Sequence, residues 1–221
     1  LDGERCSLLR LKGCIRIVLG CDDFGVGTSR ARRKYFSSNF IVENIPLRFN
    51  SKRDDVKIAL LAPRDGLPVE RLRDLVQPMV DELTELIHQG IIVITNEGSR
   101  IHVPVVMSAV CADNLGMNEL LGYRMSFNNN TFVCRFCGAT GHELKYWWHF
   151  RLLEDHDLDY EQVIRDLRNG LPNQFGIIRE CVLASIPGFH ILYSTPPDIL
   201  HDFCEGVLPA ITILVLMGKL N

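Results

Sequence analysis

The residues best suited to chemistry lie near the C-terminus, in the segment 197–207. Asp198, His201 and Glu205 follow one another at spacings of three and four, so on an α-helix they share one face. An apolar stretch follows directly, and ionisable groups beside buried surface need partners. We therefore interpret the segment as a site. The alternative is a first helical turn whose acids merely complement the helix dipole.

Two further acidic positions follow predicted strands. Residues 14–21 are β-branched and alternating, and they lead into Asp22 and Asp23. Residues 101–110 are apolar throughout, as in a central strand, and they lead into Asp113. A strand that ends on an acid presents a carboxylate at the rim of a sheet, although Asp is also an ordinary turn residue.

Cys134 and Cys137 form a Cys-x-x-Cys turn, which supplies two of the four ligands of a tetrahedral zinc site. The other ligands would be histidines, and the candidates are His142, His149, His156, His190 and His201. We expect His201 first, because Asp198 is placed to support it, and His190 next. The rival interpretation is a redox motif, which normally opens a helix in a βαβ context.

Composition sets the class of protein. The chain has 221 residues, 47% of them hydrophobic and 23% charged, which is typical of one large globular domain or two small ones. A net charge of −3 argues against a wholly basic nucleic-acid clamp, but the basic run at 29–35 could still face phosphates; more often such a run is a solvated face. The apolar run at 207–216 is too short to span a bilayer, no signal peptide is visible, and the eight cysteines suggest reduced thiols. Because the chain begins with Leu1, we expect it to be part of a longer protein.

The remaining elements must position these residues. We predict a meander of antiparallel strands at 14–21, 40–47 and 57–61, with the second strand broken at Pro46. Helices follow over 67–90, the second beginning at Pro78 and capped by Gly90, and then strands at 91–94 and 101–110 and a short helix at 118–122.

That order resembles a ribonuclease-H-like α/β fold, a mixed sheet flanked by helices in which the first and fourth strands lie side by side at the middle. Asp22 or Asp23 would then be a neighbour of Asp113, and Glu205 could close the triangle. Converging carboxylates suit Mg²⁺, and two such ions about 3.5–4 Å apart would activate a water or 3′-hydroxyl and stabilise the leaving oxygen.

Taken together, the motifs resemble the DDE transposases of cut-and-paste DNA transposons, especially the CACTA-like group and its zinc-containing relatives, which include the catalytic core of the V(D)J recombinase. In that family an acid on the first strand, an acid after the fourth strand, a Cys-x-x-Cys and an Asp- or Cys-x-x-His before a final Glu occur in this order. The matching segments here are Asp113-Asn114-Leu115-Gly116, Leu120-Leu121-Gly122-Tyr123, Ser126-Phe127, Cys134-Arg135-Phe136-Cys137 and 197–207.

The resemblance implies that Mg²⁺ (or Mn²⁺) is bound by Asp22, Asp113 and Glu205. It also implies a structural Zn²⁺ on Cys134, Cys137 and His201, with His190 as a further candidate. The loop at 25–29 is shorter than the family pattern, which leaves open whether Asp22 or Asp23 is the first catalytic acid.

We therefore expect a catalytic core that begins at 1–130, a mainly helical, zinc-containing insertion at 131–195, and a last catalytic helix at 196–221. The expected function is transposase cleavage of phosphodiester bonds at transposon ends and joining of 3′-hydroxyl ends to target DNA. Its expected setting is the nucleus, on double-stranded DNA, as a homo-oligomer and away from membranes. The alternative is a degenerate or domesticated copy that binds DNA or protein without catalysis. A 3′–5′ exonuclease of the same fold would normally carry Asp-x-Glu on the first strand, which is missing here.

Overall fold

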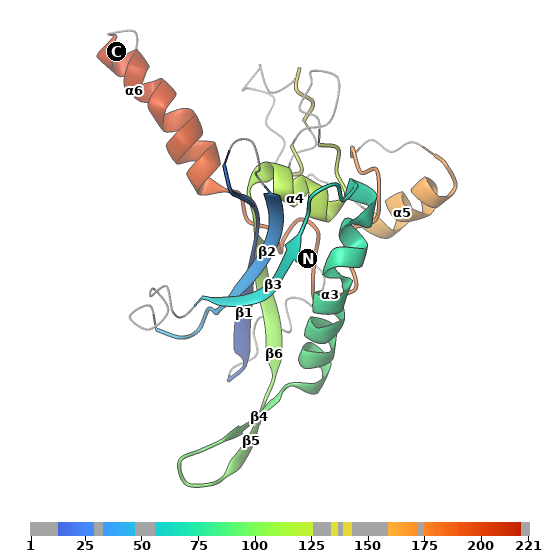
Figure 1. Ribbon diagram of the computed structural model, residues 1–221, viewed down its shortest axis with the longest axis vertical. Helices are drawn as coiled ribbons and strands as arrows, with labels where there is room; N and C mark the ends of the chain where they lie inside the picture. The colour runs from blue at the N-terminus through green and yellow to red at the C-terminus, as the bar shows by residue number, and fades with distance from the viewer. Residues whose placement is uncertain are drawn as a thin grey trace.

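A four-stranded mixed sheet forms the centre of the molecule (Figure 1). This computed structural model describes residues 13–28, 33–46, 56–125, 134–136, 139–142, 159–171 and 175–217. The strand order is β3-β2-β1-β6, where the bounds are β1 (Ile15–Val26), β2 (Arg33–Val42), β3 (Lys57–Pro63) and β6 (Val105–Cys111). The first three strands form an antiparallel meander, as predicted, and β6 joins β1 in parallel. The protein is thus of the mixed α/β class.

Strand β1 is longer than the sequence pattern indicates. Ile17, Leu19 and Cys21 alternate onto the buried face, but the strand continues past them to Val26. Asp22 and Asp23 pair with Ser37 and Phe36 of β2, so the strand does not end at the two acids as expected, and the alternative of a solvated turn there is wrong: cross-strand hydrogen bonding outweighs their preference for turns. For the same reason the end of the basic run, Arg33–Tyr35, is strand rather than loop.

Helix α3 (Leu72–Gln89) covers one face of the sheet. Its buried residues Leu72, Val76, Met79, Val80 and Leu83 join the core that β1, β2 and β6 also line. A short 3₁₀ turn, η2 (Val69–Arg71), precedes the helix. We predicted a break at Pro78, but α3 is continuous there, because Pro78 is on the exposed face while its neighbours are held against the sheet.

Gly90 ends α3, as predicted. Its φ of 64° is a left-handed value that glycine adopts without a Cβ penalty, and its N–H donates to the carbonyl oxygen of Leu86 at 2.8 Å. The strand predicted at 101–110 is divided by Pro104: β4 (Ile91–Ile94) and β5 (Arg100–Val103) form a separate hairpin, and β6 begins at Val105.

The pairing of β6 with β1 confirms that the first and fourth strands of the main sheet are neighbours. They are not both in the middle, however. Within the described residues β6 is the last strand, and its outer edge meets irregular chain, where the N–H of Val110 donates to the carbonyl oxygen of Ser194 at 2.8 Å. This coil, together with α3, explains why β6 is as apolar as a central strand.

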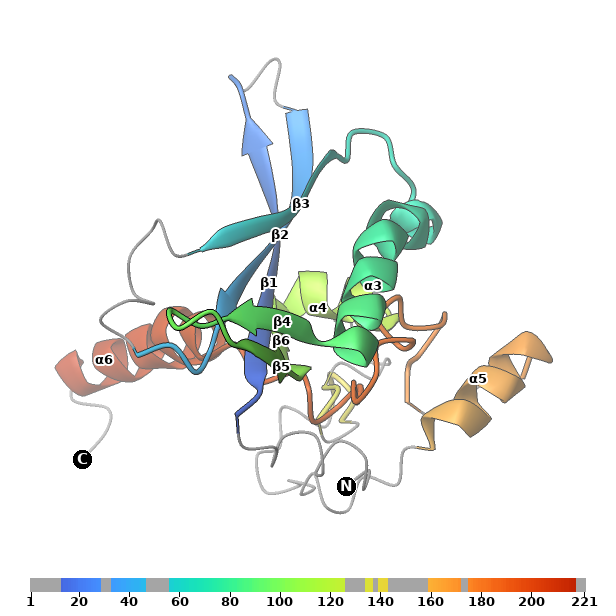
Figure 2. The same ribbon diagram turned by 90° about the horizontal axis from the view of Figure 1, so that it is seen from below.

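Four further helices complete the described structure, namely α4 (Asn114–Leu121), α5 (Tyr160–Arg168), the π-helix η6 (Leu200–Val207) and α6 (Leu208–Leu216). Helix α4 starts before the predicted residue 118 because the carboxylate of Asp113 caps it, accepting from the N–H of Gly116 at 2.6 Å. Helix α6 lies on the side of the sheet opposite α3 and points away from it, with its apolar side chains exposed (Figures 1 and 2). Among the described residues, none of the helices is both long enough and apolar enough to cross a membrane.

The buried face of β1 should dominate stability. Replacing Leu19, which is 0% exposed, with Ala should lower the free energy of unfolding by about 2–5 kcal/mol, because it removes packed methyl groups and leaves a cavity. Leu61→Ala is the matched control: this leucine is 51% exposed on β3, and its loss should cost less than about 1 kcal/mol. Urea denaturation measures both changes, and equal losses would contradict the placement of the core.

Candidate functional site

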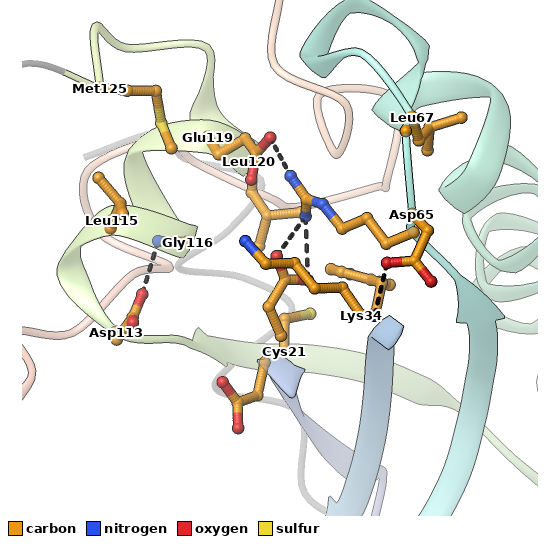
Figure 3. Close-up of a pocket in the computed structure, with 15 residues that line it drawn as sticks. Cys21, Lys34, Asp65, Leu67, Asp113, Leu115, Gly116, Glu119, Leu120 and Met125 are labelled. Atoms are coloured by element: carbon orange, nitrogen blue, oxygen red, sulfur yellow. Dashed lines mark hydrogen bonds and ion pairs between the residues drawn. The ribbon is translucent and has the colours of Figure 1, made fainter. Parts of the chain in front are cut away.

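The register between β1 and β6 brings Asp22 and Asp113 together. The last paired residues are Gly20 and Cys111, and each acid lies two positions further along its strand direction. Neighbouring strands run about 4.7–4.9 Å apart, and residues of the same parity project from the same face. The register therefore places both residues at the carboxyl edge of the sheet. Both line one cavity of about 570 Å³ (Figure 3).

A bulge decides which of the two adjacent acids is aligned with Asp113. Before the bulge Ile17 pairs with Met107, and after it Val18 pairs with Ala109, so Ser108 is the extra residue. The Ser108 hydroxyl donates to the carbonyl oxygen of Ile17 at 3.1 Å. Continued without the bulge, the earlier register would have set Asp23 opposite Asp113.

Asp23 has a different role from Asp22. It lies on the same face of β1 as Cys21, and its carboxylate pairs with the guanidinium of Arg64 at 2.9 Å. The same guanidinium also pairs with the buried carboxylate of Glu119. Burial raises the pKa of Asp23 although Arg64 opposes the shift. Asp23 is thus engaged in an internal ion pair, whereas the Asp22 carboxylate makes neither a hydrogen bond nor an ion pair within the described part of the chain.

Arg64 and Glu119 were not found from the sequence. Glu119 is almost fully buried, and its carbonyl oxygen also accepts a hydrogen bond from Arg179. The sequence does place an acid, Glu119, directly before the apolar residues Leu120 and Leu121. A carboxylate that is buried in such a stretch requires a cation as its partner. The partner could not be identified, because Arg64 lies on a distant strand end.

Lys34 adds a positive charge to the same cavity. Figure 3 shows its side chain extending across the opening toward α4, with Asp113 at the start of that helix. The Lys34 backbone N–H donates to Asp65 at 2.7 Å, which fixes the strand end that carries the side chain. The cavity is therefore lined by the acids Asp22, Asp23 and Asp113 and by Lys34, a cation suited to a phosphate group.

Asp22 also lines a second cavity, of about 480 Å³, on the other side of the strand ends. Cys111, Pro197 and Asp198 form part of its wall. The first acid therefore lies between the main cavity and the chain segment that leads into η6.

Asp198 and His201 form a pair at the start of η6. The ring Nδ1 of His201 is bonded to the Asp198 carboxylate, and the His201 backbone N–H donates to the same carboxylate at 3.2 Å. This bond raises the pKa of His201, and the charges of Glu205 and Asp113 raise it further. Burial acts to raise the pKa of Asp198, but the bonds from His201 outweigh it and lower that pKa.

Glu205 does not join the two strand acids directly. Although the pKa of His201 responds to both Glu205 and Asp113, no three His, Cys, Asp or Glu side chains in the described residues lie close enough to hold a metal ion. One reason is local: η6 is a π-helix rather than the expected α-helix, and its wider turn rotates Glu205 relative to Asp198 and His201. Glu205 is exposed, on the helix that leads into α6.

The predicted zinc ligands are only partly described. Cys137 lies outside the described residues, as do His149, His156 and part of the insertion predicted at 131–195. The ring Nδ1 of His190 accepts from the backbone N–H groups of Leu192 and Tyr193 at 3.2 and 3.3 Å, so its Nε2 would be the ligand atom. In His201 the Nδ1 contacts Asp198, an arrangement that supports metal-bound histidines, so its Nε2 would be the ligand atom.

Comparison with known families and with curated proteins found no match to this chain. The function must therefore be argued from the site. Its firmest feature is the pair Asp22 and Asp113, held by the backbone of two parallel strands beside Lys34.

Removing Arg64 should destabilise the protein strongly. Arg64→Met leaves the buried Glu119 carboxylate without its cation, which should cost about 3–5 kcal/mol of unfolding free energy. The matched control is Arg71→Met, since Arg71 pairs with Asp74 on the surface and its loss should cost about 0.5 kcal/mol or less. Urea denaturation of both variants tests this, and similar costs would show that the Arg64 pair is not structural.

In metal-free protein the imidazole of His201 should titrate above its usual pKa of about 6.5. Because the pKa of His201 is raised in the folded protein, its pair with Asp198 stabilises the fold fully when the pH is below about 6.5. This stabilisation is lost as the pH rises through the folded-state pKa of His201. The lowered pKa of Asp198 means that its contribution is lost as the pH falls through that pKa. NMR titration should show the His201 pKa falling in Asp198→Asn, and an unchanged value would refute the pairing.

Proposed function

We propose that this chain is the catalytic core of a DDE-type transposase that cuts phosphodiester bonds at transposon ends and joins 3′-hydroxyl ends to target DNA. The observation that carries the proposal is the alignment of Asp22 with Asp113 at the carboxyl edge of β1 and β6. The antiparallel meander of β1 to β3 and the parallel pairing of β6 with β1 agree with a ribonuclease-H-like core. The lining of the cavity by both acids supports the same assignment.

Asp22 and Asp113 are the residues that would hold Mg²⁺ or Mn²⁺, because such ions take one or two carboxylates and keep sites for water and phosphate oxygens. When bound, these ions would activate a water or a 3′-hydroxyl and stabilise the leaving oxygen. The Gly116 N–H fixes the orientation of the Asp113 carboxylate, and Lys34 faces the phosphate. Arg64 keeps Asp23 in an ion pair, so Asp22 is the first acid in this assignment.

Glu205 is the third acid of the proposed site. The charges of Glu205 and Asp113 both act on the imidazole of His201, which supports a position for Glu205 near the strand ends. A structural Zn²⁺ on Cys134, Cys137 and His201, with His190 as the further candidate, belongs to the same proposal. So do double-stranded DNA as substrate, a homo-oligomeric active complex and a nuclear location, which follow from the resemblance alone.

A second candidate is a domesticated module that binds DNA or protein without catalysis. The observation that favours it is the absence, within the described residues, of three gathered metal-ligating side chains. The two functions differ in what they require of Asp22 and Asp113, since a binding module needs neither carboxylate for strand cleavage.

Nicking of supercoiled plasmid in Mn²⁺ separates the two. Asp22→Asn, Asp113→Asn and Glu205→Gln should each lower the rate by about 100-fold or more, which corresponds to roughly 2.7 kcal/mol of transition-state stabilisation. Asp23→Asn and Glu161→Gln are the matched controls and should stay within about tenfold of the parent. Glu161 is exposed on α5, away from the cavity.

Two outcomes contradict the proposal. A Glu205→Gln protein that nicks as fast as the parent would remove the third acid from the site. A correctly folded parent that binds DNA but does not nick it would favour the binding module. A loss in Asp23→Asn equal to that in Asp22→Asn would reassign the first acid.

A further inference from the structure

Arg135 lies between Cys134 and Phe136 and is buried, with 5% of its surface exposed. Its Nη1 donates to the side-chain oxygen of Asn114 at 3.2 Å, and its Nη2 donates to the carbonyl oxygen of Pro196 at 3.3 Å. Its guanidinium carbon lies 4.4 Å from the centre of the Phe136 ring. A buried guanidinium is costly unless it is partnered, so these contacts define its position.

These bonds connect three parts of the chain that are distant in sequence. Asn114 directly follows Asp113, and Pro196 precedes the segment that carries Asp198 and His201. The Asn114 amide also donates to the carboxylate of Asp202, which lies within η6. Arg135 therefore joins the start of α4 to the segment that leads into η6, and Asn114 extends the connection to Asp202 within η6.

Apolar packing does not hold η6 in the described structure. Leu200, Phe203 and Val207 are all exposed, as is the whole of α6 that follows. Figures 1 and 2 show α6 directed away from the sheet. The position of η6 relative to the strand acids must therefore depend on its polar contacts, of which the chain Arg135–Asn114–Asp202 reaches the strand end itself.

The charges around Arg135 agree with a role in positioning η6. Burial lowers the pKa of Arg135, and the charges of Cys134, Asp202 and Asp198 act in the opposite direction. The cation thus lies within the electrostatic reach of Cys134, Asp198 and Asp202. Its planar fork of donors can bond an amide and a carbonyl at once, which a lysine cannot do in the same geometry.

We propose that Arg135 is a positioning residue that fixes η6, and with it Glu205, against the Asp22–Asp113 end of the sheet. Part of this inference rests on the proposed function, because the purpose of the contact is to place the third acid. The anchoring itself is a property of the fold and can be tested without catalysis.

The first test is hydrogen exchange of the backbone amides in 200–207. Arg135→Gln and Asp202→Ala should each speed exchange there by about tenfold or more, while α3 keeps its protection. Asp202 is exposed, so its variant keeps the fold even if Arg135→Gln does not. Arg165→Gln, at an exposed arginine on α5, is the matched control and should leave 200–207 unchanged. Unchanged exchange in both Arg135→Gln and Asp202→Ala would overturn the anchor.

The second test is the Mn²⁺ dependence of plasmid nicking by the same variants. A displaced Glu205 should raise the half-saturating Mn²⁺ concentration and lower kcat while KM for DNA stays constant. A merely structural role would reduce only the amount of active protein, leaving the half-saturating concentration unchanged, and that result would overturn the positioning role. Faster exchange in a protein that cuts no DNA would support the anchor and refute the proposed function instead.

Discussion

The parallel pairing of β1 with β6 is the constraint on which the rest of the site depends. It brings the end of the first strand beside a strand that the chain reaches only after β2, β3 and α3, and it does so through the backbone. Side chains alternate between faces, so a shift of one residue would exchange Asp22 for Asp23. The bulge at Ser108 sets this register. Helix α4 begins immediately after Asp113, just beyond the end of β6. The identity of the first acid is thus a consequence of strand register more than of local composition.

Asp23, the neighbouring acid, lies on the opposite face of β1 from Asp22. Asp23 points toward the interior side, where Arg64 pairs with it and with Glu119. A buried carboxylate without a cation would be unstable, so this ion-paired cluster must form whenever α4 packs on the sheet. Both acids of the Asp-Asp dipeptide line the cavity with Asp113, and the Asp23 carboxylate also helps to hold the sheet and α4 together through Arg64.

Local patterns predicted much of the fold. The meander, the cap at Gly90 and the adjacency of the first and fourth strands follow from alternation, a glycine with positive φ and strand order. Most of the failures are tertiary. Pro78 is tolerated inside α3 because of where it faces, and the bulge at Ser108 and the pairing of Arg64 with Glu119 depend on residues far apart in sequence. The π-helical form of η6 also could not be read from the spacing of Asp198, His201 and Glu205.

The two halves of the proposed site are held in different ways. Asp22 and Asp113 each lie two residues beyond the last pair of the β1–β6 ladder, whose strands also line the core, so their backbone positions depend on the sheet. Glu205 is carried by an exposed helix whose links to the body are side-chain hydrogen bonds through Asn114 and Arg135. Polar contacts of this kind depend on geometry and are individually weak compared with a packed strand. The strand acids are therefore preorganised by the fold. Whether Glu205 completes the proposed site depends on the position of η6.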